Sequence, residues 1–274
     1  MVVPDSHPPT PPSGLVQSFR DGRGPALWLM GLLVGLVAGY ATLGLRLGIG
    51  LVEQFAFGAT EEHLASKAAD FPVWRRWAIP VITGLVISLM LWLGDRLGLL
   101  RNFRSRGVPD VIEARAVGQG QIEIKSGLYS ALMACISLGG GGSAGREGPA
   151  VHLGGTLASL VSRAVGLNPR GSRILLACGA AAAVSASFNA PVAGALFAFE
   201  VVLGHYALRS IAPVAVSSVV GALVVRHQLG QDQIFGFLAM HQTQAWDFPA
   251  AALLGLAAAG LAVGFNRGVL HGSS

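Results

Sequence analysis

The residues best suited to chemistry lie in one short segment, Gly-Arg-Glu-Gly-Pro at residues 145–149. A glycine run that begins at Gly139 precedes it and permits irregular backbone. Pro149 suits the first turn of a helix, where no amide donor is needed. We therefore predict a helix that starts near Glu147 after a nonhelical stretch. The free amides and the positive dipole end of such a start form a binding site for an anion.

Glu147 places a carboxylate at this predicted anion site. If the segment lies within a membrane, an ionisable residue there is a candidate for function, because charges at that depth are costly. The alternative is a structural ion pair between Arg146 and Glu147 among tightly packed glycines. We favour the functional interpretation.

Two further segments also predict helix starts. Residues 105–110, Ser-Arg-Gly-Val-Pro-Asp, place glycine and proline together, although an ordinary cytoplasmic turn before a helix explains them equally well. Residues 188–191, Phe-Asn-Ala-Pro, precede an apolar run that ends at Glu200. The C-terminal end of a helix disfavours a carboxylate, so Glu200 either has a specific partner or faces water.

The composition indicates that these segments are set among membrane-spanning helices. Only 12% of the residues are charged, against about 25% in soluble domains, and the charges cluster between long uncharged stretches. We therefore predict an all-α membrane protein. The net charge of +5 does not indicate nucleic acid, because the basic residues lie near span ends. Cys135 and Cys178 fall in apolar segments and are interpreted as buried small side chains, without metal-ligand or disulfide spacing.

The apolar runs predict full spans at both ends of the chain and broken helices between them. Residues 25–52 are long enough to cross about 30 Å of hydrocarbon. A mixed-charge loop is predicted at 53–76 and a second span at 77–93. Short runs interrupted by glycine or proline follow and are typical of transporters whose half-helices meet near the midplane. These runs cover 127–138, 150–165, 172–186, 190–203 and 211–225, before a longer one at 248–265.

Glycines on the first span predict close helix packing. Gly31, Gly35 and Gly39 recur every four residues, as do Gly44 and Gly48, and such a face favours tight contact with another helix. The proline-rich residues 1–24 are predicted to form a disordered tail. Basic residues clustered within 94–125 place that segment and the N-terminus in the cytoplasm.

The three segments, in this order, resemble the CLC chloride channel and transporter family. The resemblance rests on Gly-Arg-Glu-Gly-Pro at 145–149 and on Phe-Asn-Ala-Pro-Val-Ala-Gly-Ala-Leu-Phe-Ala-Phe-Glu at 188–200, with 105–109 as a weaker match. It covers about residue 25 to the end. It implies one CLC-like transmembrane domain at 25–274 and multiple tilted and broken helices in the first half of an inverted-repeat fold.

The resemblance also implies a function and its residues. Glu147 would be the external gate, whose carboxylate competes with chloride for the pathway. The backbone around Arg146, Glu147 and Gly148 would face the outer anion site, and the helix start at Ser105, Arg106 and Gly107 the inner one. A voltage-gated homodimer in a prokaryotic inner membrane is implied, with one pathway per subunit. Chloride or a similar anion is the transported ligand, and no cofactor, metal or nucleic acid is implied.

Two substitutions depart from the family pattern. Arg106 stands where the family usually has the serine that helps hold the central anion, which changes the expected selectivity. Val201 stands where proton-coupled members carry an internal glutamate. Because valine cannot relay a proton, we expect channel-like conduction or an exchanger with another proton route.

A third departure concerns length. The later Gly-x-Phe-x-Pro motif and pore tyrosine of the family do not occur in this sequence. We therefore expect a fragment or a truncated gene product, with the second half of the fold largely missing. An alternative function is a non-conducting remnant or scaffold.

An enzyme is a remote alternative. Residues 141–145 match the Gly-x-Ser-x-Gly elbow of serine hydrolases, with Ser143 as nucleophile and His152 or His205 as base. That elbow requires a preceding strand, whereas a glycine run and a membrane segment precede this one, and no third orienting group is evident. We therefore expect no enzymatic activity.

Overall fold

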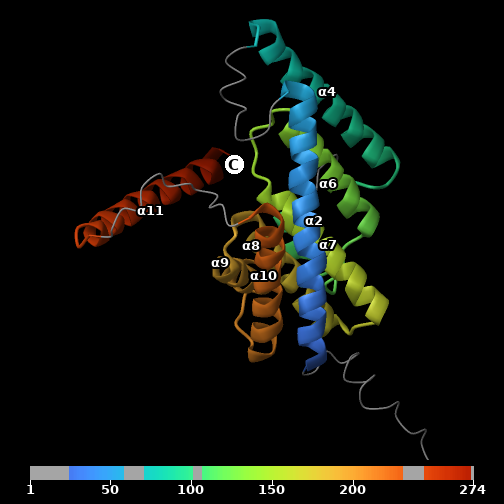
Figure 1. Ribbon diagram of the computed structural model, residues 1–274, viewed down its shortest axis with the longest axis vertical. Helices are drawn as coiled ribbons and strands as arrows, with labels where there is room; N and C mark the ends of the chain where they lie inside the picture. Colours follow the sequence, from blue (N-terminus) through green and yellow to red (C-terminus); the bar gives the residue numbers. More distant parts are fainter. Residues whose placement is uncertain (1–24, 59–70, 101–106, 231–243, 273–274) are drawn as a thin grey trace, which may run out of the picture. The chain divides into compact units, whose positions relative to one another are not determined.

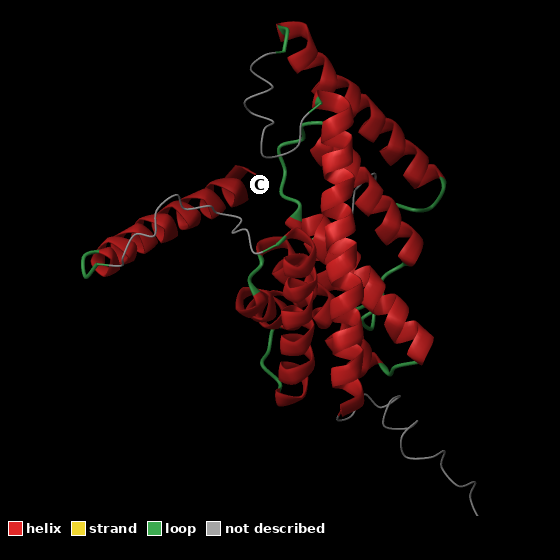
Figure 2. Cartoon of the chain, in the orientation of Figure 1, coloured by secondary structure: helices red, strands yellow, loops and turns green. Residues whose placement is uncertain are grey.

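The computed structural model describes residues 25–58, 71–100, 107–230 and 244–272. These parts are helical and contain no strand (Figure 2), which confirms the predicted all-α class. The elements are α2 (Pro25–Phe57), α4 (Val73–Arg96), α5 (Val108–Ala116), α6 (Ile124–Gly139), α7 (Glu147–Val165), α8 (Pro169–Phe188), α9 (Pro191–Phe197), η1 (Ala198–Leu203), α10 (Leu208–Leu229) and α11 (Asp247–Gly272). The chain forms two units, Met1–Ile234 and Phe235–Ser274, which we describe separately.

The glycine face of α2 packs against α10 in the first unit (Figure 1). A Cβ atom built on Gly31 would lie 2.7 Å from the Pro213 carbonyl oxygen, and one on Gly35 would lie 2.8 Å from that of Ser217. The backbones therefore approach more closely than any larger residue allows, as the four-residue glycine spacing predicts. Gly44 differs from this expectation, because a Cβ atom built there would have no other atom within 4 Å.

Helix α8 lies at the centre of the first unit and packs against α2, α7 and α10. Its residues 175–187 are all buried, and most of them are alanine, glycine or serine. The small side chains let Gly179 of α8 meet Gly154 of α7 backbone to backbone. Cys178 is fully buried as expected, whereas Cys135 of α6 is only partly buried.

Helix α4 belongs to the first unit and contacts the rest of it mainly through α6. Gly94 is its buried residue and lies against the ring of Tyr129, whose hydroxyl donates a 2.7 Å hydrogen bond to the Met90 carbonyl. Most of the large apolar side chains on the rest of α4 are exposed, and the others are partly buried. In the second unit, α11 has exposed side chains along its length. Such surfaces suit lipid or further protein.

The helices are longer than the apolar runs predict. Five of the described helices are long and apolar enough to cross a membrane: α2, α4, α8, α10 and α11. The runs at 172–186 and 211–225 are therefore not too short to span, because α8 and α10 extend through polar ends such as Arg170 and Arg226. The predicted loop at 53–76 is partly wrong for the same reason, since both flanking helices extend into it. The predicted tail at 1–24 lies outside the described residues.

Candidate functional site

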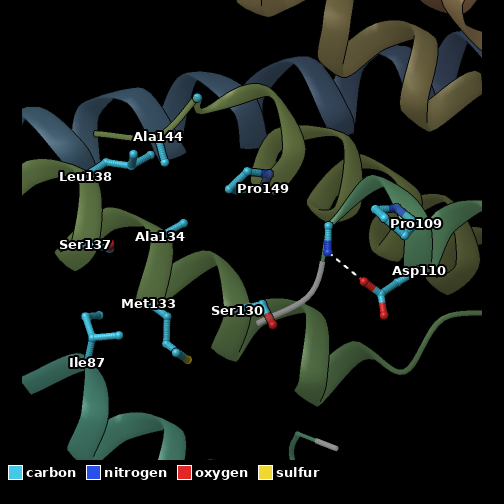
Figure 3. Close-up of a pocket in the computed structure, with 12 residues that line it drawn as sticks. Ile87, Pro109, Asp110, Ser130, Met133, Ala134, Ser137, Leu138, Ala144 and Pro149 are labelled. Atoms are coloured by element: carbon cyan, nitrogen blue, oxygen red, sulfur yellow. Dashed lines mark hydrogen bonds between the residues drawn. The ribbon is translucent and has the colours of Figure 1, made fainter. Parts of the chain in front are cut away.

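A cavity of about 390 Å³ lies where two predicted helix starts meet. The start of α5 contributes Gly107, Pro109 and Asp110, and the approach to α7 contributes Ala144, Gly145 and Pro149. The remaining lining comes from α4 and α6, through Ile87, Ser130, Met133, Ala134, Ser137 and Leu138. In Figure 3 the labelled α6 side chains lie together, with Ile87 on one side and Pro149 on the other.

Helix α5 begins as its glycine and proline predict. Gly107 is the N-cap in extended conformation, and Pro109 occupies the first turn. The carboxylate of Asp110 accepts a 2.8 Å hydrogen bond from the Gly107 amide, drawn as a dashed line in Figure 3. Asp110 is buried, so this end of the cavity already holds a negative group. The other predicted inner residues, Ser105 and Arg106, lie outside the described residues.

Helix α7 also begins where the sequence predicts, at Glu147, after a nonhelical stretch. The Glu147 side chain folds back over Gly145, because a Cβ atom built on Gly145 would collide with Glu147 Oε2. Gly145 lines the cavity, so the carboxylate contacts one of the lining residues. Glu147 and Gly148 are partly buried and do not themselves line the cavity.

Arg146 does not line this cavity. It is among the residues that line a separate small cavity, with residues of α2, α8 and α10 that include Arg46. Adjacency in sequence therefore does not bring Arg146 and Glu147 to the same cavity lining.

The α6 residues of the cavity were not predicted. Ser130 and Ser137 are seven residues apart, so two helical turns place both hydroxyl groups on the same face. This spacing is the signal that was available. It is weak, because serines are common in membrane helices without any role in binding.

Val201 and Glu200 lie in the π-helical segment η1 and do not line the cavity. Glu200 has a specific partner, since Tyr206 donates a 2.8 Å hydrogen bond to its carboxylate. This bond, with smaller contributions from desolvation and from the Glu200 charge, raises the pKa of the Tyr206 phenol. Glu200 is also exposed, so it has a specific partner and faces the surroundings of the chain as well.

A third cavity, of about 380 Å³, lies between α5, α6 and α7. His152 lines it and is buried, whereas Ser143 is exposed in the nonhelical stretch before α7. Ser143 and His152 therefore face different surroundings, which argues against this pair in the hydrolase interpretation. The other nominated base, His205, is exposed and lines neither cavity. Asp110 lines both this cavity and the one between the helix starts. No metal-binding group of three His, Cys, Asp or Glu residues occurs in the described parts.

Known proteins resemble this chain in sequence and in fold. A family model for voltage gated chloride channels matches residues 83–274. A ClcB-like chloride channel protein of Ralstonia nicotianae is 32% identical over 82% of this chain and 52% of its own length. A voltage-gated ClC-type chloride channel of Yersinia pestis, ClcB, is 31% identical over 76% of this chain and 49% of its own. The chain thus spans about half the length of these relatives.

Two solved structures share the fold. A slow cyanobacterial Cl⁻/H⁺ antiporter superimposes with a TM-score of 0.64 at 23% identity, over 81% of this chain and 51% of that protein. A CLC-type fluoride/proton antiporter gives 0.65 at 21% identity, over 84% of this chain and 54% of that protein. The matched family consists of membrane channels and transporters rather than enzymes. The chain belongs to the voltage-gated chloride channel family, as its two helix-start motifs predict.

Proposed function

We propose that this chain supplies one half of a chloride pathway across the membrane, in a CLC-like domain at 25–274. One observation supports this most directly: the starts of α5 and α7 line the same cavity of about 390 Å³. Each start is the positive end of a helix dipole, and two such ends at one cavity favour an anion between them. Chloride is the transported ligand, and the pathway requires no cofactor.

Glu147 is the proposed gate. Its carboxylate lies against Gly145 at the cavity edge, so a negative group stands beside the position proposed for the anion. A carboxylate and a chloride ion repel each other, so in this proposal chloride enters when the carboxylate moves away or is protonated. The anion site combines the backbone at Gly107 with that of residues 146–148. Ser105 and Arg106 belong to the inner end of this proposal.

We favour channel-like conduction over proton coupling because of Val201, an apolar residue at the position where an internal glutamate is expected. A second candidate is proton-coupled exchange. It is favoured by the solved relatives, which are described as Cl⁻/H⁺ and fluoride/proton antiporters. The two functions differ in whether a chloride gradient moves protons.

The test is chloride efflux from vesicles that contain the purified protein. A potassium gradient across the vesicle membrane and the carrier valinomycin let potassium ions balance the charge that chloride moves. Because the chain supplies one half of the pathway, efflux is expected when it is joined to the second half of the fold, and faster efflux is expected from the same protein with Glu147→Gln, which mimics the protonated carboxylate. Glu113→Gln is the matched control, because Glu113 lines the His152 cavity and not the proposed pathway. An unchanged rate in Glu147→Gln would remove Glu147 from gating, and proton uptake driven by chloride would replace passive conduction with exchange.

The same vesicles separate transport from the non-conducting alternative. If no preparation of the chain conducts although chloride binds to it, the remnant or scaffold interpretation replaces the transport proposal. We further propose a homodimer in a prokaryotic inner membrane with a cytoplasmic N-terminus. Mass measurement in detergent tests the dimer, and labelling of a cysteine added before residue 24 tests the orientation.

A further inference from the structure

The glycine run before the proposed gate is held between α2 and α4. Gly139 is the last residue of α6 and Gly140 its C-cap, and both are buried. A Cβ atom built on Gly139 would lie 2.5 Å from the Val52 Cβ atom of α2, and one built on Gly140 would collide with the Thr83 side chain of α4. Neither position has room for a larger residue, so the run fits against these two helices only as glycine.

Phe57, the last residue of α2, contacts the next glycine of the run. The Phe57 side chain is buried, and a Cβ atom built on Gly141 would lie 3.4 Å from its ring. The same ring stacks on that of Phe71, with 6.4 Å between the centroids. The Arg75 guanidinium of α4 lies 4.6 Å from the Phe71 centroid and donates a 3.4 Å hydrogen bond to the Ala56 carbonyl. The start of α4 thereby helps to hold the Phe57 ring in place.

Backbone hydrogen bonds fix the same part of the run to α6. Three successive amides donate to carbonyls near the end of α6, at 2.8 to 3.1 Å: Gly140 to Ile136, Gly141 to Leu138 and Gly142 to Ser137. The Ala144 amide instead donates within the run, to the Gly142 carbonyl, and residues 141–145 are exposed. The run therefore has a fixed part, 139–142, and a less constrained part, 143–146, that leads to Glu147.

We propose that Phe57 and Thr83 are positioning residues for the Glu147 carboxylate, an inference that rests on the proposed role of Glu147 as the gate. The carboxylate lies against Gly145, and only two residues separate Gly145 from the end of the fixed part at Gly142. Contacts that hold the fixed part therefore determine where Gly145 meets the carboxylate. When they are loosened, the Gly145 backbone shifts and Glu147 loses this resting contact.

The division of the run into two parts suits a gate. Buried segments with close contacts stay with the helices around them, whereas exposed residues with few hydrogen bonds absorb changes in backbone angles. Movement of Glu147 is therefore confined to residues 143–146, while α2, α4 and α6 stay in place. Side chains that never touch the carboxylate thus determine how often it occupies its resting position.

The first test measures amide hydrogen exchange across residues 139–148 in the full chain, with detection by mass spectrometry. Phe57→Ala removes the ring beside Gly141, so the amides of residues 140–142 should exchange about tenfold faster, as expected for the loss of an aromatic contact. Phe55→Ala is the matched control, because Phe55 is on the same helix and is 93% exposed. Equal exchange in the two variants would overturn the proposal.

A second pair of substitutions tests Thr83. Gly140→Ala places a methyl group against the Thr83 side chain and should also speed exchange of residues 140–142. Thr83→Gly removes the three atoms nearest to that methyl group, so the double variant should exchange more slowly than Gly140→Ala alone. Exchange in the double variant that is as fast as in Gly140→Ala would remove Thr83 from the positioning role.

Chloride efflux from the chain joined to the second half of the fold separates positioning from stability. Phe57→Ala should speed efflux when Glu147 is present and have no effect in a Glu147→Gln background, where the charge at the resting position is already removed. A change by the same factor in both backgrounds would show that Phe57 only supports the fold, and would overturn the proposal.

The two measurements also separate this proposal from that of the gate. If Glu147→Gln leaves efflux unchanged, the gate is refuted and the positioning role falls with it, whatever the exchange of residues 140–142. If Glu147→Gln speeds efflux while Phe57→Ala and Phe55→Ala exchange alike, the gate stands and only the positioning role is refuted.

Discussion

The Asp110 carboxylate accepts a hydrogen bond from the Gly107 amide, with 2.8 Å between the two atoms. This amide belongs to the helix start that is proposed to face the inner anion. The chain therefore supplies its own negative group to the first amide of α5. Pro109 has no amide hydrogen, and the Asp110 amide donates to the Gly107 carbonyl. An anion at this end must therefore use the Val108 amide or displace Asp110 from Gly107.

Removal of the Asp110 carboxylate should destabilise the protein. Asp110→Ala leaves the Gly107 amide without its partner, and the loss of such a cap costs about 1 to 2 kcal/mol in the free energy of unfolding. Asp110→Asn keeps an acceptor oxygen and should cost less. Chemical unfolding in detergent micelles measures both.

Glu113 is the control for this prediction. It lies on the same helix with an exposed side chain, so Glu113→Ala removes a carboxylate without removing the contact to Gly107. Equal losses of stability in Asp110→Ala and Glu113→Ala would mean that the hydrogen bond contributes nothing measurable.

Two glycines of α2 should respond to substitution in opposite directions. Gly35→Val forces side-chain atoms against the Ser217 carbonyl and should cost about 1 to 3 kcal/mol through overpacking. Gly44→Ala meets no atom and should stabilise the helix by about 0.5 to 1 kcal/mol, because alanine loses less backbone entropy. The same unfolding measurement tests both, and a loss of stability in Gly44→Ala would refute the assignment of an open position.

These two glycines also show how far the sequence predicts the fold. Four-residue spacing predicts a packing face, and the Gly31 and Gly35 positions confirm it. The spacing alone does not distinguish Gly44, because which helix covers a face depends on tertiary packing. Helix lengths were underestimated for a related reason: polar ends such as Arg226 remain helical, since the chain continues its hydrogen bonds beyond the apolar run.

The candidate site was predictable where local chemistry determines it. Proline and glycine define the starts of α5 and α7, and both starts occur at the predicted positions. The position of Arg146 at a different cavity was not predictable, because the surroundings of a residue at a helix start depend on which neighbours enclose it. The contribution of Ser130 was missed because only the folded arrangement brings α6 to the cavity.

The contact between Tyr206 and Glu200 predicts a titration. The phenol donates to the carboxylate, and its pKa is raised, so the contact is fully present below the ordinary tyrosine pKa and is lost as pH rises through the raised value. In Glu200→Gln the charge is removed, and Tyr206 should ionise at lower pH. Phenolate absorbance follows this change, and Tyr206→Phe identifies which of the three tyrosines is responsible. An unchanged titration in Glu200→Gln would exclude the contact in solution.

Gly145 offers a sharper test of the gate than removal of Glu147 alone. A Cβ atom on Gly145 collides with Glu147 Oε2, so Gly145→Ala should displace the carboxylate from the cavity edge without backbone strain, because Gly145 is not in the left-handed region. Chloride should then bind more tightly to the purified chain in calorimetry. In a Glu147→Ala background there is no carboxylate to displace, so Gly145→Ala should have no further effect.

Gly148→Ala is the control, since a Cβ atom built on Gly148 would meet open space. Equal effects of Gly145→Ala in both backgrounds would show that the methyl group acts on the cavity itself, and Glu147 would lose its place beside the anion.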